Sequence, residues 1–221
     1  MQPIYLMGTI LEMIGSYFLY AYLVSRSKEN CSIKDFFAPG IRKRELVFTI
    51  VVIGLTLSAG IYGQLKQQYS AMQCYINIMM LFLVAAMAWV DYREKIIPNV
   101  LVLVGIGLGV LQMLMEIFVI ETDWRMALKF SLGGALIWGG ILLLIALIVK
   151  SALGMGDVKM FFAIGLTYGA NNTYEILLLS LVFMALVSIM LLVMKKATKK
   201  TAIPMAPFVL LGLYSSIMLG F

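Results

Sequence analysis

Residues 130–149, FSLGGALIWGGILLLIALIV, form an apolar run without a single charged side chain. Crossing the roughly 30 Å hydrocarbon core of a bilayer takes about 20 apolar residues in a helix, so this run is long enough to span a membrane. Its apolar positions are continuous and do not alternate with period two, which argues against a strand of a membrane β-barrel. The stretch therefore predicts a transmembrane helix, which we expect to cover residues 127–149.

Similar runs fill most of the 221-residue chain, in which 62% of residues are hydrophobic and 13% are charged. A soluble domain this apolar could not cover its surface with polar groups. Charged residues, prolines and glycines divide the chain into about eight expected spans. These lie near residues 3–25, 46–63, 74–90, 99–120, 127–149, 157–170, 174–194 and 204–221. The sequence thus predicts an all-α, polytopic transmembrane helix bundle, with residues 1–221 as one integral membrane domain.

The composition excludes several classes of hydrolase. The chain has no histidine, which removes Ser-His-Asp and Cys-His nucleophile pairs and the HExxH zinc site. Cys31 and Cys74 offer neither a CxxC pair nor a zinc-ligand spacing. Any general acid or base must therefore be Asp, Glu, Lys or Tyr. We expect no metal and no cofactor.

The net charge of +6 resides mainly in short loops between the apolar runs. That pattern sets membrane topology and favours anionic lipid headgroups, not nucleic acid. Fourteen of the 17 lysines and arginines follow odd-numbered spans, and only Lys66, Arg125 and Lys129 fall on the other side. By the positive-inside rule, both termini are expected outside and four loops are expected in the cytoplasm. These loops are 26–45, 91–98, 150–158 and 195–203.

Acidic side chains inside or beside the spans are few, and the main ones are Glu12, Asp91, Glu116 and Asp157. An ionisable group at membrane depth is costly, so each is a functional candidate. Glu12 stands near the middle of its span, where we expect a buried hydrogen bond. Asp91 and Asp157 are both assigned to the cytoplasmic side, and a bundle of the third to sixth spans could bring them together.

Two nearby carboxyl groups are a known route to peptide hydrolysis. Like charges a few ångströms apart cannot both ionise easily, so the pair holds one shared proton. The ionised member can take a proton from water while the protonated member polarises the scissile carbonyl. This chemistry needs neither histidine nor a metal.

Glycines precede the second of these acids. Gly154 and Gly156 can adopt backbone conformations closed to other residues and allow another chain to approach closely. Only 16 residues separate Gly154 from Gly169 inclusive, which is short for a span. The segment is therefore expected at the membrane boundary, with Lys159 reaching back towards the interface. An extended substrate backbone could lie against it.

Three motifs carry a resemblance to a known family. Gly154-Met155-Gly156-Asp157-Val158-Lys159 matches the GxGD signature of intramembrane aspartyl proteases, in the GxGDxK form typical of type IV prepilin peptidases. Asp91-Tyr92-Arg93-Glu94-Lys95-Ile96-Ile97-Pro98-Asn99 resembles that family's other aspartate motif. Ile203-Pro204-Met205-Ala206-Pro207-Phe208 is similar to the start of its last span. The resemblance covers roughly residues 75–221.

The resemblance implies an activity and a location. Such enzymes cut the short basic leader from prepilins and pseudopilins at the cytoplasmic boundary of the prokaryotic cell membrane, just before the hydrophobic helix of the substrate. Asp91 and Asp157 would be the catalytic pair. The residues that bind substrate or shape the site would be Gly154, Gly156, Lys159, Pro98 and Asn99. Preflagellin-type or presenilin-like substrates stay open within the same class.

The larger members of that family also methylate the new N-terminus. They use a cytoplasmic region between the first two spans that usually carries paired CxxC motifs. Here loop 26–45 contains a single Cys31. The chain therefore resembles the short, peptidase-only forms, and we expect no methyltransferase activity.

Structural explanations exist for the same residues. Asp157 could simply be a helix N-cap, and Asp91 could be an interfacial residue paired with Arg93 or Lys95. Pro98 would end a loop, with Asn99 capping the following helix. Gly105, Gly109 and the pairs Gly133-Gly134 and Gly139-Gly140 would allow close helix packing.

Two other function classes remain alternatives. A small ion- or proton-coupled transporter could use Asp91 and Asp157 to relay protons or bind a cation. Inverted repeats and acids near mid-membrane would favour a transporter, but no repeat is visible and both acids are assigned to one face. A non-catalytic membrane scaffold would have no need for two motif-embedded acids on one side.

Overall fold

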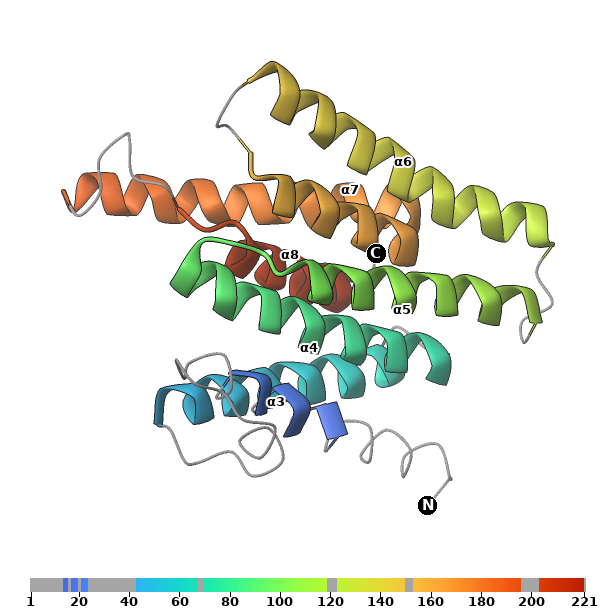
Figure 1. Ribbon diagram of the computed structural model, residues 1–221. Coiled ribbons are helices and arrows are strands. Elements are labelled where there is room, and N and C mark those ends of the chain that lie inside the picture. The colour runs from blue at the N-terminus through green and yellow to red at the C-terminus, as the bar shows by residue number, and fades with distance from the viewer. Residues whose placement is uncertain are drawn as a thin grey trace.

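The computed structural model shows a bundle of helices (Figure 1). It describes residues 14–15, 17–19, 21–23, 43–66, 70–118, 123–149, 153–195 and 203–220. The labelled helices are α3 (Lys43–Leu65), α4 (Ala71–Glu94), α5 (Asn99–Phe118), α6 (Trp124–Ile148), α7 (Met155–Val193) and α8 (Ala206–Leu219). No strand occurs in these described ranges, so the predicted all-α class is confirmed.

The predicted count of about eight spans is not confirmed. In the described ranges, five helices, α3 to α7, are long and apolar enough to cross a membrane. Helix α8 is apolar but has only 14 residues. The expected spans 157–170 and 174–194 both fall within α7, which has 39 residues. Most of the expected span 3–25, including Glu12, lies outside the described residues, as does most of loop 26–45.

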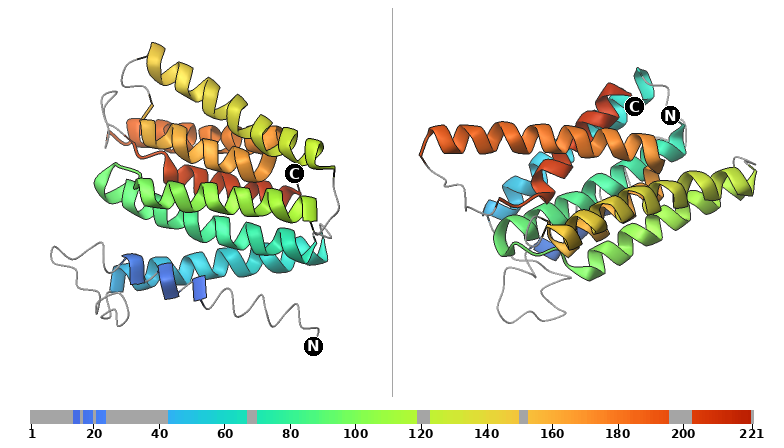
Figure 2. Two further views of the ribbon diagram at one scale, coloured as in Figure 1. Left: turned by 45° about the vertical axis from the view of Figure 1, so that its right-hand side comes forward. Right: turned by 90° about the horizontal axis from the view of Figure 1, so that it is seen from above.

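Helix α7 is interrupted at Gly169. The backbone there has φ 71° and ψ −175°, a conformation that glycine adopts without strain. The parts of α7 before and after this residue run in opposite directions (Figures 1 and 2). The indole nitrogen of Trp138 donates a hydrogen bond to the Ala170 carbonyl at 2.7 Å, which satisfies a backbone acceptor beside the break. The reversal returns the end of α7 to the end of the bundle where α7 begins.

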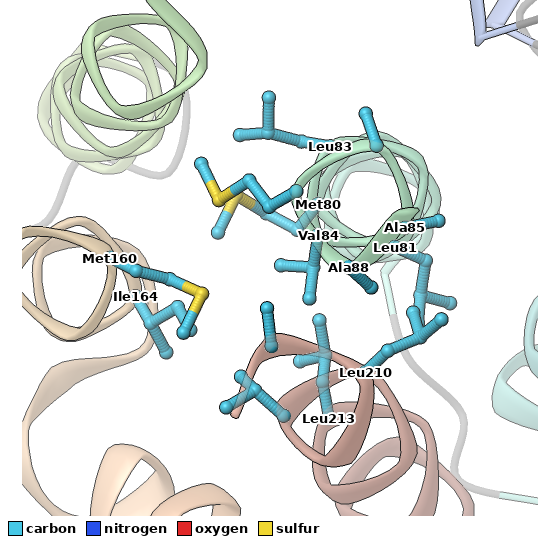
Figure 3. Packing of buried hydrophobic residues seen from close by; sticks show 14 of the residues in the cluster. Met80, Leu81, Leu83, Val84, Ala85, Ala88, Met160, Ile164, Leu210 and Leu213 are labelled. Atoms are coloured by element: carbon cyan, nitrogen blue, oxygen red, sulfur yellow. The ribbon is translucent and has the colours of Figure 1, made fainter. Parts of the chain in front are cut away.

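Helix α4 forms the centre of the bundle. In its most apolar stretch 78% of the residues are buried, against 17–33% in the other four candidate spans. Its neighbours are α3, α5 and α8. Figure 3 shows the core, to which α4 contributes Met80, Leu81, Val84 and Ala88, α7 contributes Met160 and Ile164, and α8 contributes Leu210 and Leu213. This packing fixes the last turn of α4 beside the first turns of α7 and α8.

The outer helices expose the side chains that lipid would cover. Leu103 on α5 and Leu136 and Leu147 on α6 are each about two-thirds exposed. So many exposed large apolar groups would be unfavourable in water but suit a hydrocarbon solvent. Together with the lengths of the helices, they identify a membrane protein.

One end of the bundle gathers several helix termini (Figure 1). Helix α4 ends there, and α3, α5, α7 and α8 begin there. We call this the site end. The helix termini that flank loops 91–98, 150–158 and 195–203 all lie at it, whereas α3 ends and α4 begins at the opposite end. The charge count assigned these three loops to one side of the membrane, and the described helix ends beside them lie at one end of the bundle.

Several of the glycines predicted to pack closely do so. A Cβ added at Gly105 or Gly109 would press on Leu83 or Leu166, and one at Gly134 would overlap the backbone of α7. Gly139 faces Phe162, but Gly133 and Gly140 meet no atom within 4 Å. The expectation is therefore wrong for one member of each pair, because consecutive helical residues point about 100° apart and cannot both face the same neighbour.

Candidate active site

Asp91 lies in the last turn of α4 and is buried, with 6% of its surface exposed. One carboxylate oxygen, Oδ2, accepts a hydrogen bond from the Ala206 amide at 2.9 Å. The backbone of Met205 adds a second hydrogen bond. Asp91 is therefore not the surface residue of the ion-pair alternative. Arg93 instead pairs with Glu45, at 3.5 Å between Nη1 and Oε1.

These two amides belong to the start of α8, where Met205 is the N-cap. The first amides of a helix have no partner within the helix, and its positive end attracts a carboxylate. The motif 203–208 thus supports Asp91, a role that the sequence analysis missed. The motif itself was visible in the sequence, but nothing in it indicates a contact with Asp91, which lies 115 residues before Ala206.

Asp157 lies in the first turn of α7. The N-cap of this helix is Gly154, so the N-cap alternative for Asp157 is wrong. Asp157 occupies the third helical position, and the Gly154 backbone hydrogen-bonds to its carboxylate. This is the reciprocal half of a capping box, which commonly uses an acidic residue at that position. The interaction holds the side chain back over the start of α7.

The two acids meet at the site end. Both line one pocket of about 310 Å³, together with residues from both aspartate motifs. They interact electrostatically, although they are carried by different helices. In the described part of the chain, no third His, Cys, Asp or Glu joins them to form a metal-binding group. The shared pocket is open and is lined by both polar and apolar side chains.

The loop after α4 packs directly on Gly156 of the second motif. A Cβ added at Gly156 would lie 2.9 Å from the Cβ of Ile97, which is closer than side chains approach. The absence of a side chain at Gly156 therefore allows the two motifs to touch. Lys95 turns the chain out of α4 in a left-handed conformation, with φ 56°, and so directs the loop towards this contact.

A polar contact links the motifs on the other side of the pocket. The ammonium group of Lys159 donates to the side-chain oxygen of Asn99 at 3.0 Å. The Pro98 carbonyl accepts from the amides of Leu101 and Val102. Pro98 thus occupies the position before the helix, and the expectation that Asn99 caps α5 is wrong. Asn99 is the first helical residue, and its side chain is used for the contact with Lys159.

All seven predicted site residues therefore lie together, since Asp91, Asn99, Gly154, Gly156, Asp157 and Lys159 line the pocket and Pro98 adjoins it. The arrangement offers two interacting carboxyl groups that line one pocket, and the backbone hydrogen-bonds to both of them. Such a pair can activate water and polarise a carbonyl.

Comparison with known proteins agrees with the motifs. The model of the type IV leader peptidase family matches residues 78–189, which include both aspartates and the helices α5 and α6 between them. Neither a curated protein nor a solved structure gives a significant match to the chain.

Proposed function

The chain belongs to the type IV leader peptidase family, and we propose that it is an aspartyl endopeptidase that removes the short basic leader of prepilin-like or pseudopilin substrates. The single observation that carries the aspartyl mechanism is the pocket shared by Asp91 and Asp157. The family and this pocket both favour a peptidase over a transporter that uses the same acids.

The mechanism follows from the carboxyl pair. The pair holds one proton, because two adjacent charges repel each other. The ionised carboxyl takes a proton from a water molecule, which attacks the scissile carbonyl as the protonated carboxyl donates to its oxygen. The proton gained from water then passes to the leaving amine as the C–N bond breaks, and a hydroxyl of the intermediate returns a proton to the carboxyl that had donated one. Amides at the start of α8 keep Asp91 in place throughout.

The leader would be cut at the cytoplasmic boundary of the prokaryotic cell membrane. The asymmetry of lysines and arginines supports this orientation, with the site end inside and both termini outside. Anionic headgroups would contact the basic loops. The single Cys31, which lies outside the described residues, supports a chain that cleaves but does not methylate the product.

The orientation can be tested by cysteine accessibility. In a background with Cys31 and Cys74 replaced by serine, Lys43→Cys and Lys195→Cys should react only with reagent on the cytoplasmic side. Ser70→Cys, at the opposite end of the bundle, should react only from outside. All three residues are exposed, so accessibility depends on sidedness. Labelling of Lys43→Cys and Lys195→Cys from the outer side would reverse the proposed topology.

The activity itself is tested with purified full-length chain in detergent or liposomes. The substrate is a peptide with a short basic leader followed by an apolar helix, and the products are identified by mass spectrometry. We expect one cut between leader and helix. Uncut substrate in the presence of folded protein would contradict the proposal, and proton or cation flux in the same liposomes would support the transporter.

A further inference from the structure

An apolar groove runs between α5, α6 and the first part of α7. It encloses about 560 Å³, and its walls are almost entirely apolar. Ile106 of α5, Leu143 of α6 and Phe162 of α7 contribute to the three walls. In Figure 1 the ribbon of α6 diverges from that of α7 towards the site end.

The groove adjoins the pocket of the two acids. Asn99, Met155 and Lys159 line both spaces. From Asn99 the groove extends at least to Ile106 along α5, which is about 10 Å at 1.5 Å per residue. Polar groups therefore surround the end nearest the carboxyls, and the rest is apolar.

A polar end beside the carboxyls followed by an apolar groove suits one kind of ligand. A substrate whose scissile bond is followed directly by a hydrophobic helix would place its peptide bond at the carboxyls and the helix in the groove. On the α6 side the groove is lined by the small residues Ala135, Gly139 and Gly140. Small residues allow helices to approach closely enough to displace lipid. Gly140 leaves open space, since a Cβ there would meet no atom within 4 Å.

We propose that this groove receives the first turns of the substrate's apolar helix and so positions the scissile bond at Asp91 and Asp157. The proposal rests on the proposed peptidase function and assigns the part of the chain that recognises the substrate beyond the bond that is cut. Recognition of the helix would add binding energy away from the reacting atoms and orient the peptide bond.

Filling the groove tests this assignment. Gly140→Leu places a side chain in the open space, so the KM for a substrate with an intact apolar helix should rise roughly tenfold. Cleavage of a short soluble peptide with the same scissile sequence but no helix should change far less. Gly133→Leu is the matched control. A Cβ added at Gly133 also meets no atom within 4 Å, and Gly133 lies two turns away on the same face of α6. This variant should cleave like the wild type.

Crosslinking gives a readout that does not depend on activity. In an Asp157→Asn background, a photoreactive residue replacing Leu136, which lines the groove, should crosslink to the helix of the substrate. The same residue replacing Ile137, an exposed neighbour on another face of α6, should not.

The outcomes separate the two proposals. Suppose that the wild-type chain cleaves the helical substrate, that Gly140→Leu has the same KM as the wild type, and that no crosslink forms at position 136. This result would overturn the groove assignment and leave the peptidase function intact. A wild-type chain that cleaves neither substrate would overturn the peptidase function, and the groove assignment would fail with it.

Discussion

Asp91→Asn and Asp157→Asn should each lower the kcat for leader cleavage by roughly a thousandfold or more, because each removes a group that exchanges protons in the reaction. Folding should be nearly unaffected. In the wild type the Ala206 amide donates a hydrogen bond to the Asp91 carboxylate at 2.9 Å. An asparagine at position 91 keeps a side-chain oxygen that can accept this hydrogen bond. The loss of stability should then be about 1 kcal/mol. Cleavage rates and thermal unfolding in detergent measure the two effects.

Glu116→Gln provides the control for removing an acid from a span. Glu116 accepts a hydrogen bond from Gln112 at 2.9 Å on α5 and does not line the pocket of the two aspartates. We expect this variant to cleave at the wild-type rate. Wild-type cleavage by either aspartate variant, at the same bond, would remove that aspartate from the mechanism.

Gly156→Val should reduce kcat/KM on the order of 100-fold, the effect of a misplacement of about 1 Å at a reacting centre. The first side-chain carbon alone would lie 2.9 Å from Ile97. The loop between α4 and α5 must therefore move away from the second motif, and the two carboxyls lose their alignment. The measurement is steady-state cleavage of the helical substrate, with circular dichroism to confirm that the helices form.

A compensating change distinguishes this steric effect from a general loss of folding. Ile97→Gly removes the atoms that valine would strike, so the double variant should recover part of the lost activity. Gly107→Val serves as the control, because a Cβ at Gly107 meets no atom within 4 Å. If Gly107→Val impaired cleavage as strongly as Gly156→Val, close contact between the motifs would not be the cause.

Much of the arrangement could be predicted from local sequence. Apolar runs indicate helices because each must satisfy its own backbone in lipid, and expected spans such as 127–149 agree with α6 to within three residues at either end. The two aspartates were predicted to meet because the lysine and arginine count placed both at one side. That prediction needed only the order of the spans, not their packing.

Other features depend on contacts between distant parts of the chain. The amide that holds Asp91 comes from Ala206, and nothing near Asp91 in the sequence indicates it. Asn99 was expected to cap a helix, as asparagine often does, but tertiary packing brings Lys159 to its side chain. The reversal within α7 occurs at Gly169, where φ is positive, and a single glycine among the many in the spans does not reveal its backbone angles.

The central claim is that Asp91 and Asp157 act as one unit, and the most direct measurement compares the residual kcat of both single asparagine variants with that of the double variant. Residues that act together are strongly non-additive. The account predicts that the double variant is no slower than either single one. A double variant slowed by the product of the two single effects would show that the carboxyls contribute independently and would contradict the shared mechanism.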